Sequence, residues 1–325
     1  LKDRLKNFKS VVNTLNTEAR FITTTGVFSN NNSNDNNDVA NLTTSSTATS
    51  GTFSLVVNNL ARETKLISTG FAETSSAIGN GTIAITVGST VTEITIDDSN
   101  SSLDGIRLAI NNSGANVQAN FINDGSTTNP VKLVISGKQT GTENAVSISA
   151  SNTLFGFGQS SPISFTETQA AQNASFDLDG IAVSKASNVV TDVISGTTLT
   201  LESAGSGIIT LSPDEEAIKE KVQNYVDGYN EIILHLRSEL ALTESTGETG
   251  VLFANFTIQN LQQTLRETVS DEVVGIDGSF NFLSQIGVRT QTDGTISIDD
   301  GALSTAIASD IGNVTQLFSS SGRTS

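Results

Sequence analysis

Apolar residues follow two periods along the chain, a helical one at both ends and a strand-like one in the middle. In residues 1–20 the apolar positions are three or four apart, which is the spacing of one helical face. They form a heptad stripe at Leu1, Leu5, Phe8, Val12, Leu15 and Ala19. This pattern predicts an amphipathic helix whose apolar face needs a partner.

A longer helix is expected to start at Ser212. Ser212 can cap it, Pro213 suits the first helical position, and Glu215 completes a capping box. Burial of its apolar stripe would contribute on the order of 10–20 kcal/mol before entropy is subtracted, so this helix also needs a partner. The stripe consists of Ile218, Val222, Tyr225, Tyr229, Ile232, Leu236 and Leu240. We expect it to pack against the N-terminal helix.

The rest of the C-terminal region has the same helical character. One stripe contains Phe256, Leu261, Leu265 and Val269, and another contains Leu303, Ile307, Ile311, Val314 and Phe318. Between them, an alternating segment turns at Asp293-Gly294, which predicts a β-hairpin.

Alternation dominates the middle of the chain. Phe53, Leu55 and Val57 predict one strand, and residues 82–97 predict two strands joined by a turn or bulge near Gly88-Ser89. Further strands are expected in residues 117–121, 131–137 and 144–150. A short helix capped by Ser101 or Ser102 should end near Gly114, whereas the polar residues 29–51 are expected to be a linker or surface loop.

These patterns predict a multidomain α+β fold. A discontinuous, coiled-coil-like helical domain is expected from residues 1–36 and 213–325, with a small hairpin. Two β-rich domains would be inserted in it, an inner one from residues 37–72 and 163–212 and an outer one from residues 73–162 with one short helix.

Composition and charge exclude several classes of protein. The formal net charge of -17 argues against nucleic-acid binding, which requires a basic face. The basic side chains of residues 1–20 are expected to be a solvated face, and no apolar run has the length of a membrane helix. Without cysteine there is no disulfide or thiolate metal site. A chain that starts at Leu1 and contains no methionine is expected to be a fragment.

Histidine and paired carboxylates supply few candidates for catalysis. His235 is the single histidine, and it is expected at the edge of the solvent face of its helix, away from any catalytic serine. Paired carboxylates for glycoside hydrolysis usually accompany aromatic platforms for sugar rings, and the chain lacks tryptophan. We therefore predict no catalytic residues and no enzyme activity.

Two oxygen-rich segments were candidates for calcium. One is the run Asn34, Asp35, Asn36, Asn37 and Asp38, and the other contains Asp97, Asp98, Asn100 and Asp104. Neither has the spacing of an EF-hand loop or its terminal glutamate. We therefore expect no metal and no cofactor site.

The segment FDLDGIAV contains a third pair of carboxylates, Asp177 and Asp179. A two-residue turn at Asp179-Gly180 would set Leu178 opposite Ile181. The carboxylates are then explained by turn geometry, because aspartate tolerates positive φ.

Ordered motifs cover nearly the whole chain. They are TFSLVVNNLARETKLISTGF, LAINNSGANVQANF, VKLVISGKQTGTENAVSIS, ASFDLDGIAVSKASNVVTDVISGTTLTL, VQNYVDGYNEII and FLSQIGVRTQTDGTISIDDGALSTAIASDIGNVTQLF. In this order they resemble the bacterial flagellar filament capping proteins, one of the hook-associated protein families. Lys185 and Thr197 depart from the resemblance, since an arginine and a branched apolar residue are expected there.

The resemblance implies a structural protein at the distal end of the bacterial flagellar filament, outside the cell. Several copies would form a ring-like cap that guides the folding and insertion of exported flagellin. Hook-filament junction proteins and an export chaperone would be further partners, as would host or surface glycans in some cases. The resemblance also implies terminal coiled-coil segments, which are expected to be missing from both ends of this chain.

Two other functions compete with this hypothesis. The inserted outer domain would suit a surface adhesin or a carbohydrate-binding β protein, although aromatic residues are scarce. A flagellin or a hook-filament junction protein would share the Ile-Asn motif and the helix-β-helix plan, but would not be expected to carry the long C-terminal match.

Overall fold

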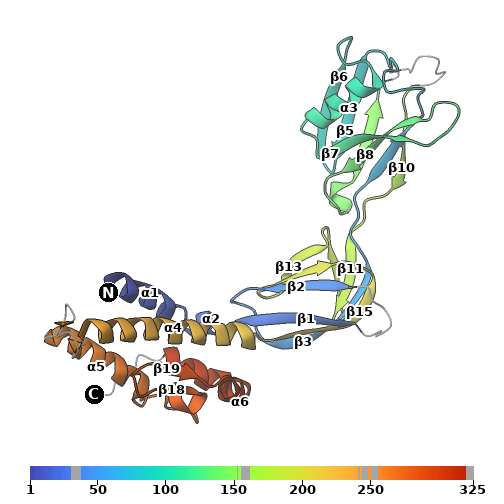
Figure 1. Cartoon of the computed structure of the whole chain (residues 1–325). Coiled ribbons are helices and arrows are strands. Elements are labelled where there is room, and N and C mark those ends of the chain that lie inside the picture. The colour runs from blue at the N-terminus through green and yellow to red at the C-terminus, as the bar shows by residue number, and fades with distance from the viewer. Residues whose placement is uncertain are drawn as a thin grey trace. The chain divides into compact units, whose positions relative to one another are not determined.

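The computed structural model describes residues 1–30, 38–151, 153–154, 162–240, 242–243, 248–249 and 255–319 (Figure 1). The chain divides into two compact units. One, the helical unit, consists of Leu1–Thr25, Thr44–Ser50 and Leu211–Ser325, and the other, the β unit, consists of Gly26–Thr43 and Gly51–Thr210. The α+β class and the helical domain built from both chain ends are confirmed.

The helical unit contains helices from both ends of the sequence and two small sheets. Its helices are α1 (Lys2–Asn13), α2 (Glu18–Phe21), α4 (Glu215–Leu240), α5 (Phe256–Ser270), the 3-10 helix η2 (Leu283–Ile286) and α6 (Asp300–Ser319). The predicted hairpin is present as β18 (Val288–Thr290) and β19 (Ile296–Ile298), and β16 (Leu242–Thr243) pairs with β17 (Glu248–Thr249).

Helices from both chain ends pack against helix α4. Helix α1 lies along it (Figure 1), and the Phe8 ring lies 5.4 Å from that of Tyr225. Tyr225 also contacts Phe318 of α6, with ring centroids 5.6 Å apart, and Phe318 stacks on Phe21 at 5.3 Å. The predicted pairing of the N-terminal helix with α4 is therefore confirmed.

Two predicted helix boundaries in this unit are wrong. The N-terminal helix ends at Asn13. The Thr14 hydroxyl donates to the carbonyl of Val11 after this end, and Leu15 turns into the core with 1 % exposure. Helix α4 begins after strand β15 (Gly205–Pro213), so Ser212 is not its cap. Asp214 takes that role, and its Oδ1 accepts from the backbone N of Ala217 at 3.0 Å.

The apolar stripe of α5 is only partly buried. Val269 is buried as predicted, whereas Phe256, at the first turn, is 79 % exposed. The first turn of α5 therefore carries an exposed aromatic residue, whereas its last turn contributes to the core.

A buried asparagine fixes the loop before η2 to helix α6. The helix is interrupted at Asp310, which has non-helical φ and ψ, and the next turn carries Asn313 at 2 % exposure. Asn313 Oδ1 accepts from the backbone N of Phe280 at 2.7 Å, and its Nδ2 donates to the carbonyls of Asp277 and Phe280 at 3.4 and 3.3 Å. A side chain at Gly278 would clash with Asn313, so the two residues fit each other closely.

The described residues of the β unit form four sheets. The first has the order β1-β15-β3-β11-β12, with β1 at Thr24–Asn30, β3 at Gly51–Asn59, β11 at Ala174–Leu178 and β12 at Ile181–Lys185. The second joins β13 (Val189–Ile194), β14 (Thr197–Leu201) and β2 (Ala40–Thr44). Strands β1 and β2 therefore replace parts of the predicted N-terminal helical domain and of the predicted linker.

The other two sheets enclose a separate apolar core with one helix. Their orders are β10-β4-β8-β7 and β6-β5-β9, with β4 at Lys65–Ser68, β10 at Phe165–Gln169, β7 at Val117–Asn123, β8 at Val131–Gly137, β5 at Gly81–Val87, β6 at Thr90–Ile96 and β9 at Val146–Ala150. The chain also forms helix α3 (Leu103–Asn112) and the 3-10 helix η1 (Thr142–Asn144). The turn at Gly88-Ser89 and the cap at Ser102 are confirmed.

The sheet partners of strands β4 and β10 are not the predicted ones. They were assigned to the inner domain, but β4 pairs with both β10 and β8 in one sheet. The exact limits of an inner and an outer β domain stay a prediction.

The Ile-Asn motif has a clear structural role within α3. Ile110 is fully buried, and Asn111 Oδ1 accepts from the backbone N of Ala119 at 2.8 Å while its Nδ2 donates to the carbonyl of Ala119 at 2.9 Å. The amide of Asn111 thus satisfies both backbone groups of Ala119 in β7, which a neighbouring strand would otherwise do.

We expect Asn313→Ala to lower the free energy of unfolding of the helical unit by about 2 kcal/mol, because it leaves backbone groups of the loop unpaired in a buried place. Chemical denaturation followed by far-UV circular dichroism measures the change. The matched control is Asn281→Ala, which removes a half-buried side chain that bonds to the exposed Glu272 and should cost less than about 0.5 kcal/mol. Equal effects of the two substitutions would contradict this role of Asn313.

Asp293, in the turn between β18 and β19, should make the stability of the helical unit depend on pH. Hydrogen bonds from Thr295 to Asp293, followed by the charge of Arg237, hold the pKa of Asp293 below its usual value. A carboxyl with a lowered pKa contributes stability above its unfolded-state pKa and loses it as pH falls through the folded-state pKa. Melting temperatures of wild type and Asp293→Asn should therefore differ most at neutral pH and converge toward about pH 2. A pH-independent difference would refute the linkage.

Candidate functional site

The carboxylates of the FDLDGIAV segment belong to a β-hairpin that also ties β11 to β3. Leu178 pairs with Ile181, as predicted, and Asp179 and Gly180 have φ of 50° and 79°. Asp179 Oδ1 accepts from the backbone N of Ser54 at 2.7 Å, and Asp177 Oδ2 accepts from Asn58 Nδ2 at 2.9 Å. Both carboxylates are therefore engaged in holding strands together. Ile181 is nevertheless 70 % exposed, because β12 is an edge strand.

The oxygen-rich segment at Asp97 is also a turn. Asp97 Oδ1 accepts from the backbone N and the hydroxyl of Ser99 at 2.9 and 2.6 Å, and these bonds lower the pKa of Asp97. Asp98 accepts from Asn80, and Asp104 pairs with Arg107 at 2.8 Å. In the described part of the chain, no three His, Cys, Asp or Glu side chains are placed to hold a metal ion. Of the other candidate segment, residues 34–37 lie outside the described residues.

His235 lies at the edge of the solvent face of α4, as expected. Its side chain is 21 % exposed, and its Nδ1 lies 3.9 Å from Glu239 Oε1. The nearby Ser238 hydroxyl donates to the backbone carbonyl of His235, so no serine-histidine pair forms here.

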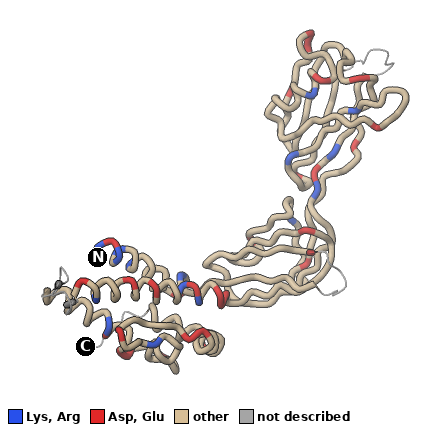
Figure 2. Tube along the Cα trace, viewed as in Figure 1, with Lys and Arg blue, Asp and Glu red and all other residues tan. Residues whose placement is uncertain are grey.

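The cations of the N-terminal helix are mostly solvated. Figure 2 shows Lys and Arg gathered on α1, while Asp and Glu are spread along the rest of the helical unit. Lys2, Lys6 and Lys9 are exposed, whereas Arg4 pairs with Glu231 at 2.9 Å. Among the described residues, no helix is both long and apolar enough to span a membrane.

An asparagine joins two motifs that are far apart in the sequence. Asn188 Oδ1 accepts from the backbone N of Ala61 at 2.7 Å, and its Nδ2 donates to the carbonyl of Ala61 at 3.1 Å. Sequence reasoning quoted both motifs but missed this contact. The sequence signal for this contact was an asparagine between two apolar strands. At such a position a side-chain amide can bond to the backbone N–H and C=O of another segment, as a neighbouring strand would.

Thr197 is buried without a partner for its hydroxyl. It is 2 % exposed, and none of the described residues forms a hydrogen bond with its Oγ1. This is the position at which the resemblance favours a branched apolar residue. Lys185 is the other departure from the resemblance, which favours an arginine. Lysine has the same charge, and its Nζ lies 2.6 Å from Asp192 Oδ2.

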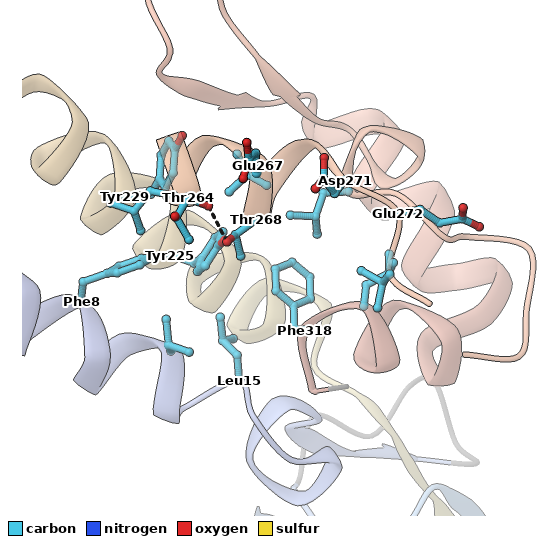
Figure 3. Close-up of a pocket in the computed structure, with 16 residues that line it drawn as sticks. Phe8, Leu15, Tyr225, Tyr229, Thr264, Glu267, Thr268, Asp271, Glu272 and Phe318 are labelled. Carbon is cyan, nitrogen blue, oxygen red and sulfur yellow. Dashed lines mark hydrogen bonds between the residues drawn. The ribbon is translucent and has the colours of Figure 1, made fainter. Parts of the chain in front are cut away.

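A groove of about 480 Å³ lies between the helices of the helical unit (Figure 3). Tyr225 and Tyr229 of α4 contribute to its lining, together with Phe8 of α1, Leu265 of α5 and Phe318 of α6. Burial raises the pKa of Tyr225 and raises that of Tyr229 to about 12, so both phenols are neutral at physiological pH. The Tyr229 hydroxyl donates to the carbonyl of Gly294 at 3.3 Å.

Comparison with known proteins identifies the class of molecule to which this arrangement belongs. The family model described as flagellar hook-associated protein 2 C-terminus matches residues 171–325. The B-type flagellar hook-associated protein 2 of Pseudomonas aeruginosa is 30% identical, with 98% of this chain and 70% of the relative covered. The flagellar hook-associated protein 2 of Escherichia coli K12 is 28% identical, with 97% of this chain and 71% of the relative covered.

Solved structures agree with these sequence relatives. The D1-D2-D3 domains of the flagellar cap protein FliD from Escherichia coli match with a TM-score of 0.74 and 27% identity, covering 100% of this chain and 90% of that one. FliD from Pseudomonas aeruginosa PAO1 matches with a TM-score of 0.53 and 28% identity, covering 64% of this chain and 99% of that one.

A helical unit closed by both chain ends, with an inserted β unit, is thus the architecture of a flagellar cap structural protein. The chain belongs to the flagellar hook-associated protein 2 family. The predicted resemblance, the structural role in the filament cap and the location at the distal end of the flagellum are confirmed.

We expect Thr197→Val to stabilise the β unit by about 1 kcal/mol, because it replaces an unpaired buried hydroxyl by a methyl of similar size. Differential scanning calorimetry should show a higher melting temperature. Thr191→Val, at an exposed position of the adjacent strand, is the control and should change it little. A lower melting temperature for Thr197→Val would show that the hydroxyl has a partner in solution.

Proposed function

We propose that this chain acts within a ring-like homo-oligomer that guides the folding and insertion of exported flagellin at the filament tip. The action is steric, and no covalent chemistry is involved. Flagellin is the principal partner of the proposed cap, and hook-filament junction proteins and an export chaperone are further proposed partners.

One observation carries this proposal: both chain ends converge on α4, and a long β region is inserted between them. Tyr225 contacts Phe8 from one end and Phe318 from the other, so the helical unit is closed around its own termini. Such a unit can serve as a leg, while the inserted sheets supply surface for contacts between subunits. The proposed three domains correspond to a leg, an inner β domain and an outer β domain.

The placement of the carboxylates and the histidine supports a role without catalysis. Asp177, Asp179, Asp97 and His235 each have local partners that explain them as turn, strand or helix-surface residues. Asp97 bonds to Ser99 within its own turn, and His235 lies beside Glu239 one turn along the same helix, so both contacts are local.

Deletion of the gene in the host of this protein tests the proposal. We expect cells without filaments, flagellin monomers in the medium, and recovery of both traits when the wild-type gene is returned. Electron microscopy measures filament length and immunoblotting measures shed flagellin. Filaments of normal length combined with a loss of surface attachment would refute the proposed guidance of flagellin and favour an adhesin.

A further inference from the structure

The groove between α1, α4, α5 and α6 resembles a place in a helix bundle where one more helix could pack. Helix α1 has no fully buried residue, and Phe8 and Val12 are half-buried beside the groove. On the opposite wall Leu265 is also half-buried, and Phe318 closes one end in the same state. Apolar side chains from three helices are therefore left partly uncovered beside the groove.

The size and lining of the groove suit apolar anchors from a helix. Its volume of about 480 Å³ has room for several side chains. Figure 3 shows Phe8, Tyr225 and Phe318 around its apolar part. An amphipathic helix presents such anchors at positions i, i+3 or i+4, and i+7, which is the spacing that a groove between helices can receive.

One rim of the groove is acidic. Glu267, Asp271 and Glu272 line it from the last turns of α5 and the residues that follow, and all three are exposed (Figure 3). Glu267 accepts from Gln263 and Glu272 from Asn281, but within the described ranges none of the three forms an ion pair. A ligand with cations beside its apolar face would supply the missing charges.

This charge pattern narrows the choice of occupant. An acidic rim repels anionic lipids and nucleic acids. A second copy carries a formal net charge of -17, and its Lys-rich helix α1 already packs on its own α4 through Phe8 and Tyr225. We propose that the groove docks an amphipathic helix of another protein, with an apolar row flanked by Lys or Arg. This inference adds a binding site and does not depend on the proposed guidance of flagellin.

A pair of designed peptides tests the site. Both are amphipathic helices with the same leucine row, one flanked by lysine and the other by glutamate. Fluorescence anisotropy of the labelled peptides measures their dissociation constants for the whole chain, at low and at physiological salt. We expect the lysine peptide to bind, with weaker binding at higher salt, and the glutamate peptide to bind at least tenfold more weakly.

Protein variants assign the binding to the groove. Neutralising the rim with Glu267→Gln, Asp271→Asn and Glu272→Gln together should raise the dissociation constant of the lysine peptide at least tenfold. The matched control neutralises three exposed carboxylates of the same unit that do not line the groove, with Glu216→Gln, Asp227→Asn and Asp300→Asn. It should leave binding within about twofold.

A third variant fills the groove without changing its charge. Thr264→Trp, at an exposed position of the α5 wall, should also abolish binding. Circular dichroism and the melting temperature confirm that each variant is folded.

Several results would overturn the proposal. These are equal binding of the lysine and glutamate peptides, no binding of either, or binding that survives both the rim variant and Thr264→Trp. Sedimentation of the chain alone supplies a further test. Self-association that the rim variant abolishes would assign the groove to a second copy and overturn docking of another protein.

Discussion

The contact of Tyr225 with aromatic rings from both chain ends is the interaction on which the helical unit depends. Phe8 and Phe318 are separated by the entire β unit in sequence, yet both rings lie within 5.6 Å of the Tyr225 ring. Aromatic pairs add to the free energy of area burial, and here they close a very long loop. Since α4 provides the shared surface, neither chain end would have a folded environment without it.

A long insertion is compatible with this arrangement because the cost of loop closure grows slowly with loop length. The β unit also has an apolar core of its own, which includes Ile83, Ile106 and Ile135. It can therefore supply broad surfaces while the helical unit maintains its own structure. This division of labour suits a structural protein whose contacts, rather than its chemistry, perform its function.

Much of the fold could be predicted from periodicity. The stripe of α4, the alternation of Leu55 and Val57, and the turn at Asp293-Gly294 each follow from local sequence, because one face of each element is buried. The boundaries of α1 and α4 could not be predicted in the same way. They depend on which residues a neighbouring strand or side chain engages, as with Ser212 in β15 and Asp214 at the cap.

The groove of the helical unit was less predictable than the fold. Its lining residues come from four helices, and its carboxylates have no sequence signature. Glu267 and Asp271 read as ordinary solvated residues of a helix, and only the fold sets them beside Phe8 and Tyr225. Asn188 likewise shows its role only through Ala61. The role of Asp179 was easier to predict, because an Asp-Gly turn between two apolar strands follows from local sequence.

Hydrogen exchange under increasing denaturant tests most directly whether the two chain ends form one cooperative unit with α4. Peptides from residues 18–24, 218–236 and 311–318 report on α2, α4 and α6. The account predicts that the three segments lose protection in the same opening reaction, with the same dependence on denaturant. Loss of protection in residues 18–24 while 218–236 and 311–318 stay protected would contradict it.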